Sequence, residues 1–247
     1  MPPIPPTSAP RITAHADTVL AQAQLLETPY FQALRNGEMT LEQFRRSQEQ
    51  FYFAVTFFPR PLAALLAKLS NPSTRQGILH NLVEEHGDFN PEEFHEATIR
   101  RFVKNIGGNT DFNSLGICPA IHSFNSLLLG TCTLDEVEVG AACLGMIEYA
   151  FIGISATLAQ QSIKRGWITP EKLSHYVLHE ELDAKHAEDF FVLVESQWDN
   201  PLRRPLIKKG LELGIYTWKC FYNGLYEAAL QAAPAAQTTA TTELVEV

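Results

Sequence analysis

The chain has 247 residues, with 19 lysines and arginines against 28 aspartates and glutamates, and a formal net charge of −9. Hydrophobic residues make up 45% of it, which is enough to build a core and excludes disorder for most of the chain. The acidic balance argues against non-specific nucleic-acid binding, so we expect no nucleic-acid partner. The four cysteines form no C-x-x-C pair and predict reduced thiols in a cytoplasmic protein (Cys118, Cys132, Cys143 and Cys220).

The chain divides into three parts by composition. Residues 1–11 hold five prolines and no apolar run, which predicts an extended leader and not a signal peptide. Residues 232–247 are small and polar without periodicity, which predicts a disordered tail. We expect residues 12–231 to form one helical domain.

Helix signals follow one another from the start of this domain. Thr28-Pro29 opens a short helix that Gly37 ends. Thr40 to Gln43 is a capping-box pattern, and it starts a helix that must break near Pro59 and Pro61.

Later signals have the same form. Further helices are expected at residues 73–86, from Asn90-Pro91 to Gly107-Gly108, from 133 to about 164, from Thr169-Pro170 to about 198, and after Asn200-Pro201. No alternating pattern with hairpin turns competes with these helices. The sequence therefore predicts an all-α fold, a compact bundle of seven to eight helices.

Residues 140–159 form the most apolar stretch, with Glu148 as its only charge. Its length would suit a transmembrane helix, but no Lys/Arg cluster flanks it and no second segment resembles it. We therefore expect no membrane partner and a central helix of the bundle. A buried carboxylate without a partner costs several kcal/mol, on the order of the penalty for an unpaired buried charge, and a metal ion is a common way to keep it ionised.

The segment HEELDAKH offers further ligands. His179, Asp183 and His186 are spaced by four and then three residues, which places them on one helix face as an N/O site for iron, manganese or zinc requires. His175 lies one turn earlier on that face and is a candidate partner behind the ligands. The alternative is a solvated, charged helix face.

A third cluster is centred on Glu84, which sits among apolar neighbours, with His95 following after a break. By itself it reads as an acidic helix terminus. Together with the other two clusters it gives three carboxylates and three imidazoles, which suits two divalent ions and favours iron or manganese over structural zinc.

These motifs resemble the haem-oxygenase-like di-iron oxidases and oxygenases, in particular the branch around the Chlamydia protein associating with death domains (CADD). The wider superfamily includes the pyrroloquinoline-quinone synthase and the TenA proteins. The resemblance covers residues 26–195 and rests on NLVEEHG, on the mid-helix Glu148 and on HEELDAKH. It implies six metal ligands: Glu84, His95, Glu148, His179, Asp183 and His186. The Glu84–His95 connection is longer than in the Chlamydia protein, so Glu85 or His86 could replace either residue.

The resemblance implies an O2-dependent enzyme with two iron ions, or manganese instead. It would oxidise a small amino-acid- or amine-type metabolite through a peroxo-di-iron(III) intermediate, by C–C or C–N chemistry or nitrile formation, within a biosynthetic pathway. An external electron donor and a homodimer are expected by analogy. The Chlamydia protein consumes its own tyrosine and lysine to make p-aminobenzoate. Tyr30 matches that tyrosine, but Leu158 stands where the lysine is expected, which disfavours this reaction.

Several side chains are expected around the metal centre. Candidates for hydrogen bonds behind the ligands or for substrate contact are Tyr30, Tyr52, Tyr149 and His175, and candidates for substrate binding are Arg60, Phe57 and Phe151, with Arg100 as a further carboxylate partner. Two other functions stay open. The first is a metal-free enzyme of the quinone-synthase or TenA type, and the second is a helical protein that binds a partner.

Overall fold

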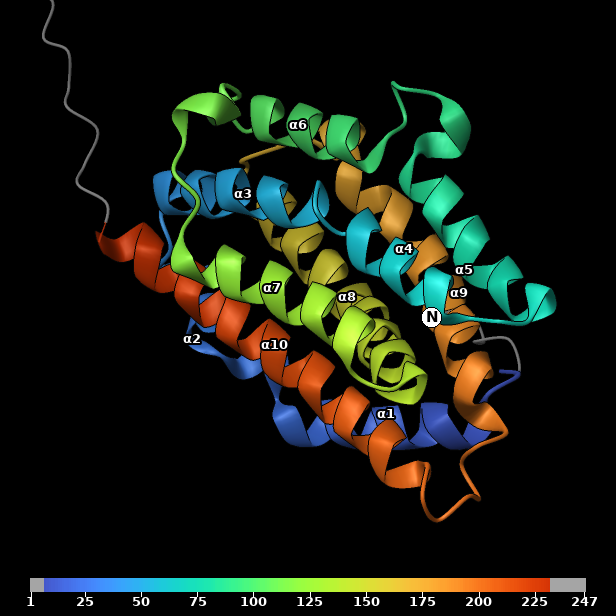
Figure 1. The fold of residues 1–247 in the computed structure, drawn as a ribbon. Coiled ribbons are helices and arrows are strands. Elements are labelled where there is room, and N and C mark those ends of the chain that lie inside the picture. Colours follow the sequence, from blue (N-terminus) through green and yellow to red (C-terminus); the bar gives the residue numbers. More distant parts are fainter. Residues whose placement is uncertain (1–6, 232–247) are drawn as a thin grey trace, which may run out of the picture.

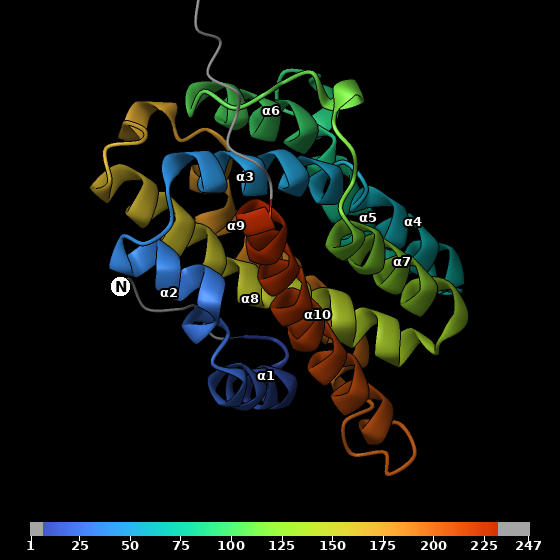
Figure 2. The same cartoon turned by 90° about the vertical axis from the view of Figure 1, so that its left-hand side faces the viewer.

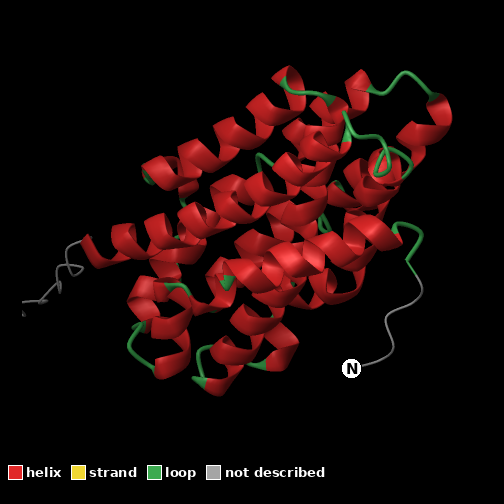
Figure 3. Ribbon diagram, turned by 90° about the horizontal axis from the view of Figure 1, so that it is seen from below, coloured by secondary structure: helices red, strands yellow, loops and turns green. Residues whose placement is uncertain are grey.

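A computed structural model describes residues 7–231, apart from the side chains of residues 177–183. All regular structure in this part is helical (Figure 3), so the all-α prediction is confirmed. The α-helices are α1 (Pro10–Ala23), α2 (Pro29–Asn36), α3 (Leu41–Val55), α4 (Pro59–Lys68), α5 (Pro72–Glu85), α6 (His95–Asn105), α7 (Pro119–Leu134), α8 (Val137–Lys164), α9 (His175–Glu195) and α10 (Arg204–Gln231).

Within the described residues the helices number more than the seven or eight predicted, because prolines start helices here as well as interrupt them. Pro10, Pro59 and Pro119 each occupy the first turn of a helix, where the missing N–H costs nothing. Pro59 therefore begins α4 after α3 has ended at Val55. The capping box predicted at Thr40 is present, with both hydrogen bonds to Gln43 formed.

Other predicted starts are displaced by a few residues. Asn90-Pro91 forms a turn, and α6 begins only at His95. Pro170 opens a 3-10 turn (Pro170–Lys172), and α9 begins at His175. At the ends, α1 already includes the last two residues of the predicted leader, while residues 1–6 and 232–247 lie outside the described part.

Helix α8 runs through the centre of the bundle, and α9 and α10 pack along it (Figure 1). It has the length and apolarity of a membrane-spanning helix, but 78% of its most apolar stretch is buried by the rest of the protein. Seen from the side, α3 and α6 lie above this core and α1 below it (Figure 2). The expected central helix of the bundle is therefore α8.

Glycines let the neighbours of α8 approach its backbone. A Cβ on Gly210 of α10 would lie 2.5 Å from the carbonyl oxygen of Val139, and one on Gly145 of α8 would lie 2.5 Å from the Phe191 ring of α9. Such distances leave no room for a methyl group, so these contacts require glycine. The close packing fixes the height and rotation of α8, and with them the position of Glu148.

Candidate metal centre

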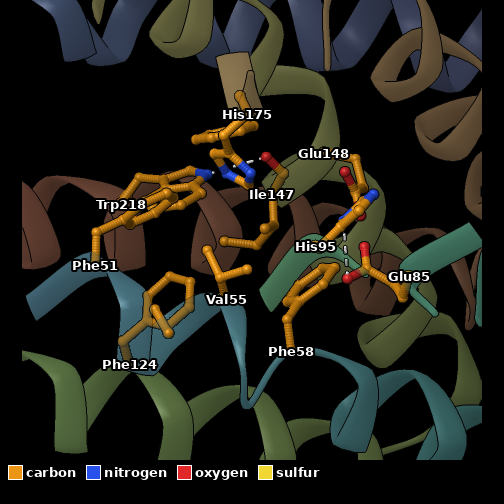
Figure 4. A pocket seen from close by; sticks show the side chains of 12 residues that line it. Phe51, Val55, Phe58, Glu85, His95, Phe124, Ile147, Glu148, His175 and Trp218 are labelled. Atoms are coloured by element: carbon orange, nitrogen blue, oxygen red, sulfur yellow. Dashed lines mark hydrogen bonds and ion pairs between the residues drawn. The ribbon is translucent and has the colours of Figure 1, made fainter. Parts of the chain in front are cut away.

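A small cavity of about 50 Å³ lies beside the middle of α8 (Figure 4). Its walls are apolar side chains, most of them aromatic: Phe51, Ala54, Val55, Phe58, Phe124, Ile147, Phe151 and Trp218. Four polar side chains complete the lining, namely Glu85, His95, Glu148 and His175. Carboxylates and imidazoles from α5, α6, α8 and α9 thus meet at one apolar space.

Glu85 and His95 form the first pair. Glu85 is the last residue of α5 and His95 the first of α6, and His95 Nδ1 lies 3.0 Å from Glu85 Oε2 with both side chains buried. Gly87, at φ +53, makes the tight reversal between the helices, where a Cβ would lie 2.5 Å from the backbone of Glu93. The connection between Glu85 and His95, which the sequence comparison expects to be longer than in the Chlamydia protein, therefore folds back on itself. The C-terminus of α5 and the N-terminus of α6 meet as a result.

Glu148 and His186 form the second pair. Glu148 lies in the middle of α8 and is 5% exposed, and His186 on α9 is 1% exposed. His186 Nδ1 is 4.0 Å from Glu148 Oε2. The carboxylate in the apolar helix and one histidine of the HEELDAKH segment therefore face each other inside the protein.

Glu84 lies on a different side of α5 from the cavity. Its Oε2 is 2.9 Å from His186 Nε2 and 2.7 Å from His80 Nδ1, and the cavity lining contains Glu85 in its place. Burial raises the pKa of Glu84, but hydrogen bonds with His186 and His80 outweigh it and lower the pKa below its ordinary value. The geometry therefore favours Glu85 over Glu84 as the carboxylate paired with His95.

Helix periodicity explains the exchange. Glu85 follows the buried Ile78 by seven residues, two helical turns, so both share the face turned inward. Apolar neighbours in sequence pointed to Glu84, whereas this spacing points to Glu85. His86, the other alternative, has Nδ1 2.7 Å from the carbonyl oxygen of Leu82 and does not line the cavity.

His175 lines the cavity itself, although the sequence predicted only a supporting role. Its Nδ1 lies 2.9 Å from the Thr98 hydroxyl, and that hydroxyl donates to the His95 carbonyl oxygen at 2.9 Å. Since the hydroxyl has a single proton, His175 Nδ1–H must be the donor to Thr98. In the neutral ring Nε2 then carries the lone pair.

His179 and Asp183 belong to α9, but their side chains lie outside the described part, so their ligand roles stay predictions. Among the side chains that are described, no three histidine, cysteine or acidic groups form a metal-sized cluster. What the structure brings together is the two pairs, with His175 beside them on the cavity wall.

The other candidate residues fall into two groups. Phe151 lines the cavity, and Tyr30 is buried behind it, with its hydroxyl 2.8 Å from Ser47 Oγ. Burial raises the pKa of Tyr30 well above its ordinary value. The remaining candidates point elsewhere: Tyr52 donates to Glu96 and accepts from Arg100, Tyr149 donates to Asp17, and exposed Arg60 stacks on Phe57. The cavity-lining Phe124 and Trp218 were not predicted, because no local pattern marks which core aromatics will face a cavity.

The donor set suits iron. Carboxylate and imidazole donors without thiolate are typical of non-haem iron and manganese sites, and the buried cysteines Cys132 and Cys143 do not line the cavity. Burial raises the pKa of the Cys132 thiol to about 12, which keeps it protonated. The fold and these residues define a helical bundle with an interior carboxylate–histidine site, the arrangement of metal-dependent redox proteins.

Comparison with known proteins gives the family. The model of the haem-oxygenase-like iron-containing redox enzymes matches residues 45–215, and the chain belongs to this family. The predicted resemblance is therefore confirmed at family level.

Individual relatives are distant. The chain is 24% identical to a 4-aminobenzoate synthase of Nitrosomonas europaea, over 85% of this chain and 89% of that protein. It is also 24% identical to a 4-aminobenzoate synthase of Chlamydia muridarum, over 72% and 75%. A CADD-like protein of unknown function from Nostoc punctiforme shares the fold with a TM-score of 0.74 at 15% identity, over 89% and 97% of the two chains. A TenA homologue from Pseudomonas syringae gives 0.70 at 15% identity, over 87% and 93%.

Proposed function

We propose that this protein is an O2-dependent non-haem di-iron oxidase or oxygenase that acts on a small amino-acid- or amine-type metabolite. The observation that carries the proposal is that Glu85, His95 and Glu148, from three helices, line one buried aromatic cavity, with His186 on a fourth helix 4.0 Å from Glu148. Two carboxylates buried close to imidazoles in an apolar interior are a donor set that suits divalent iron, whose positive charge would offset the cost of burying their negative charges.

In this proposal the two pairs, together with His179 and Asp183, hold two iron ions. When bound, iron supplies the redox chemistry with O2, which protein side chains cannot perform. The chain itself contributes fixed coordination and a dry space. The Trp218 indole donates to the carbonyl oxygen of Ile147 at 3.0 Å, next to Glu148, and so fixes one wall of the cavity.

The aromatic walls also bear on the substrate. Phe51, Phe151 and Trp218 stack successively, with ring centroids 5.7 and 5.6 Å apart. Such walls favour contact with the apolar part of a substrate. A cavity of about 50 Å³ has room for only a few water-sized groups, so we expect the wall to move when an organic molecule binds.

The test is anaerobic titration of the full chain with Fe(II), followed by exposure to O2. We expect two iron ions per chain, and O2 uptake that one class of amino acids or amines stimulates. Glu148→Ala should lose iron, while Glu93→Ala, an exposed glutamate in the turn before α6, should retain it. Absence of stoichiometric iron uptake by the unmodified protein would contradict the proposal and favour the metal-free alternative.

Self-sacrificing p-aminobenzoate synthesis is the second candidate, because curated relatives bear that name. Leu158, expected at the position of the consumed lysine, is fully buried in α8. Tyr30 does not line the cavity: its ring packs on Tyr222 at 4.9 Å, and Tyr222 packs on Trp218 at 5.5 Å. We therefore expect no p-aminobenzoate and no change in protein mass after reaction with Fe(II), O2 and a reductant, as measured by mass spectrometry.

A further inference from the structure

Glu84 connects the exterior of the bundle with a buried ligand candidate. The side chain is 12% exposed, and its Oε2 is shared by His80, which is 52% exposed, and His186, which is 1% exposed. Lys185 Nζ approaches the other carboxylate oxygen at 3.8 Å. His80 and Lys185 therefore hold the Glu84 carboxylate on its exposed side, while the same carboxylate contacts the buried His186 imidazole.

The interface between α5 and α9 keeps these groups in register. Gly77 leaves room for Asp189, whose carboxylate would lie 2.9 Å from a Cβ at that position. With its amide oriented to suit both acceptors, Asn81 donates to Asp189 Oδ2 at 3.1 Å and to the Gly77 carbonyl oxygen at 3.3 Å. Glu84 lies one turn after Asn81 on α5, and His186 lies one turn before Asp189 on α9. The contact between Glu84 and His186 therefore follows from the packing of the two helices.

Hydrogen-bond chemistry decides which nitrogen of His186 carries the proton. An ionised carboxylate accepts and cannot donate, so the nitrogen 2.9 Å from Glu84 must be Nε2–H. In a neutral imidazole the lone pair is then on Nδ1, which is the nitrogen on the side of Glu148. A metal ion binds the lone pair of a neutral imidazole.

We propose that Glu84 is a positioning residue that fixes His186 with its proton on Nε2 and thereby presents Nδ1 to the metal. The proposal rests on the proposed iron site and assigns different tasks to two consecutive glutamates. Glu85 faces His95 and the cavity as a ligand, whereas Glu84 acts only through the His186 ring. A carboxylate behind a histidine ligand orients the ring and increases its basicity.

The first test reads the tautomer directly, without metal or turnover. Long-range 1H–15N NMR of the metal-free full chain, with the His186 signal assigned by its loss in His186→Gln, should show the proton on Nε2. In Glu84→Ala the signal should shift toward the Nδ1–H form or a mixture. A His186 proton on Nδ1 in the unmodified protein would overturn the proposal.

The second test is anaerobic Fe(II) binding measured by calorimetry. Glu84→Ala should weaken the affinity for one ion by about 10- to 100-fold, the usual effect of losing such a partner. Glu84→Gln keeps an acceptor oxygen of the same shape and should bind nearly as the unmodified protein does, while Glu85→Gln should lose an ion. Glu93→Ala serves as the surface control.

The outcomes separate the two proposals. If the unmodified protein takes up no iron, the proposed function fails. If it takes up two ions and Glu84→Ala binds them equally well, only the role of Glu84 fails. Equal loss of one ion in Glu84→Gln and Glu84→Ala would identify Glu84 as a ligand and also overturn the positioning role.

Discussion

Two helix interfaces position Glu148 and His186, the second pair of the candidate metal centre, and they are built differently. Helix α8, which carries Glu148, meets α10 through glycines and aromatic rings, whereas α9, which carries His186, meets α5 through an amide, carboxylates and imidazoles. In the first interface backbone lies against backbone, and in the second side chains lie against side chains. Glu148 is therefore placed by rigid packing and His186 by hydrogen bonds, and these two kinds of contact respond differently to substitution.

The largest effect is expected where backbone lies against backbone. In Gly210→Ala the new methyl group would lie 2.5 Å from the Val139 carbonyl oxygen and 2.7 Å from Ala142 Cβ, and neither atom can rotate away. Overpacking of this kind costs about 3 kcal/mol, which exceeds the gain of about 1 kcal/mol in helix propensity. Urea unfolding followed by circular dichroism should show this loss. Unchanged stability would mean that α8 and α10 can separate without cost.

A second substitution tests an aromatic side chain in the same interface between α8 and α10. Trp218→Phe removes the donor to the Ile147 carbonyl oxygen and leaves a gap beside Phe151 and the cavity. We expect a loss of about 2 kcal/mol from the missing hydrogen bond and contacts, measured by the same unfolding experiment. Trp198→Phe, a partly buried tryptophan in the turn after α9, is the matched control and should change stability much less. Equal losses in both variants would contradict a special role for the cavity wall.

The contribution of the polar interface between α5 and α9 to the free energy of unfolding should depend on pH. Burial raises the pKa of Asp189 above its ordinary value, so the folded state binds its proton more tightly than the unfolded state does. Stability from this group is therefore present below about pH 4 and decreases as the pH rises through the raised folded pKa. Asp189→Asn, which keeps an acceptor oxygen for Asn81, should remove this decrease and be the more stable form at neutral pH. Unfolding curves across the acid range will show whether the two proteins diverge as the pH rises.

The same contrast explains which features were predictable from the sequence. The capping box at Thr40 and the mid-helix Glu148 are local signals in the sequence. In the structure Thr40 caps α3, and Glu148 is buried in the interior. The choice between Glu84 and Glu85 depends on which side of α5 faces the cavity. That side is set by the reversal at Gly87 and the approach of α9, which involve residues about a hundred positions apart. The local pattern leaves Glu84 and Glu85 as candidates, and the spacing from Ile78 selects Glu85 only once the packing shows that Ile78 faces inward.

The smallest effect is expected for Gly77→Ala, the counterpart in the polar interface of Gly210→Ala. The methyl group would lie 2.9 Å from the Asp189 carboxylate, which is a side chain and can shift by a few tenths of an ångström. The strain should nearly cancel the gain of about 1 kcal/mol in helix propensity, so stability should change little. Iron affinity is the more sensitive readout, because movement of Asp189 and Asn81 displaces α9 relative to Glu84. A stability loss as large as that of Gly210→Ala would show that both interfaces are equally rigid and would remove the distinction between them.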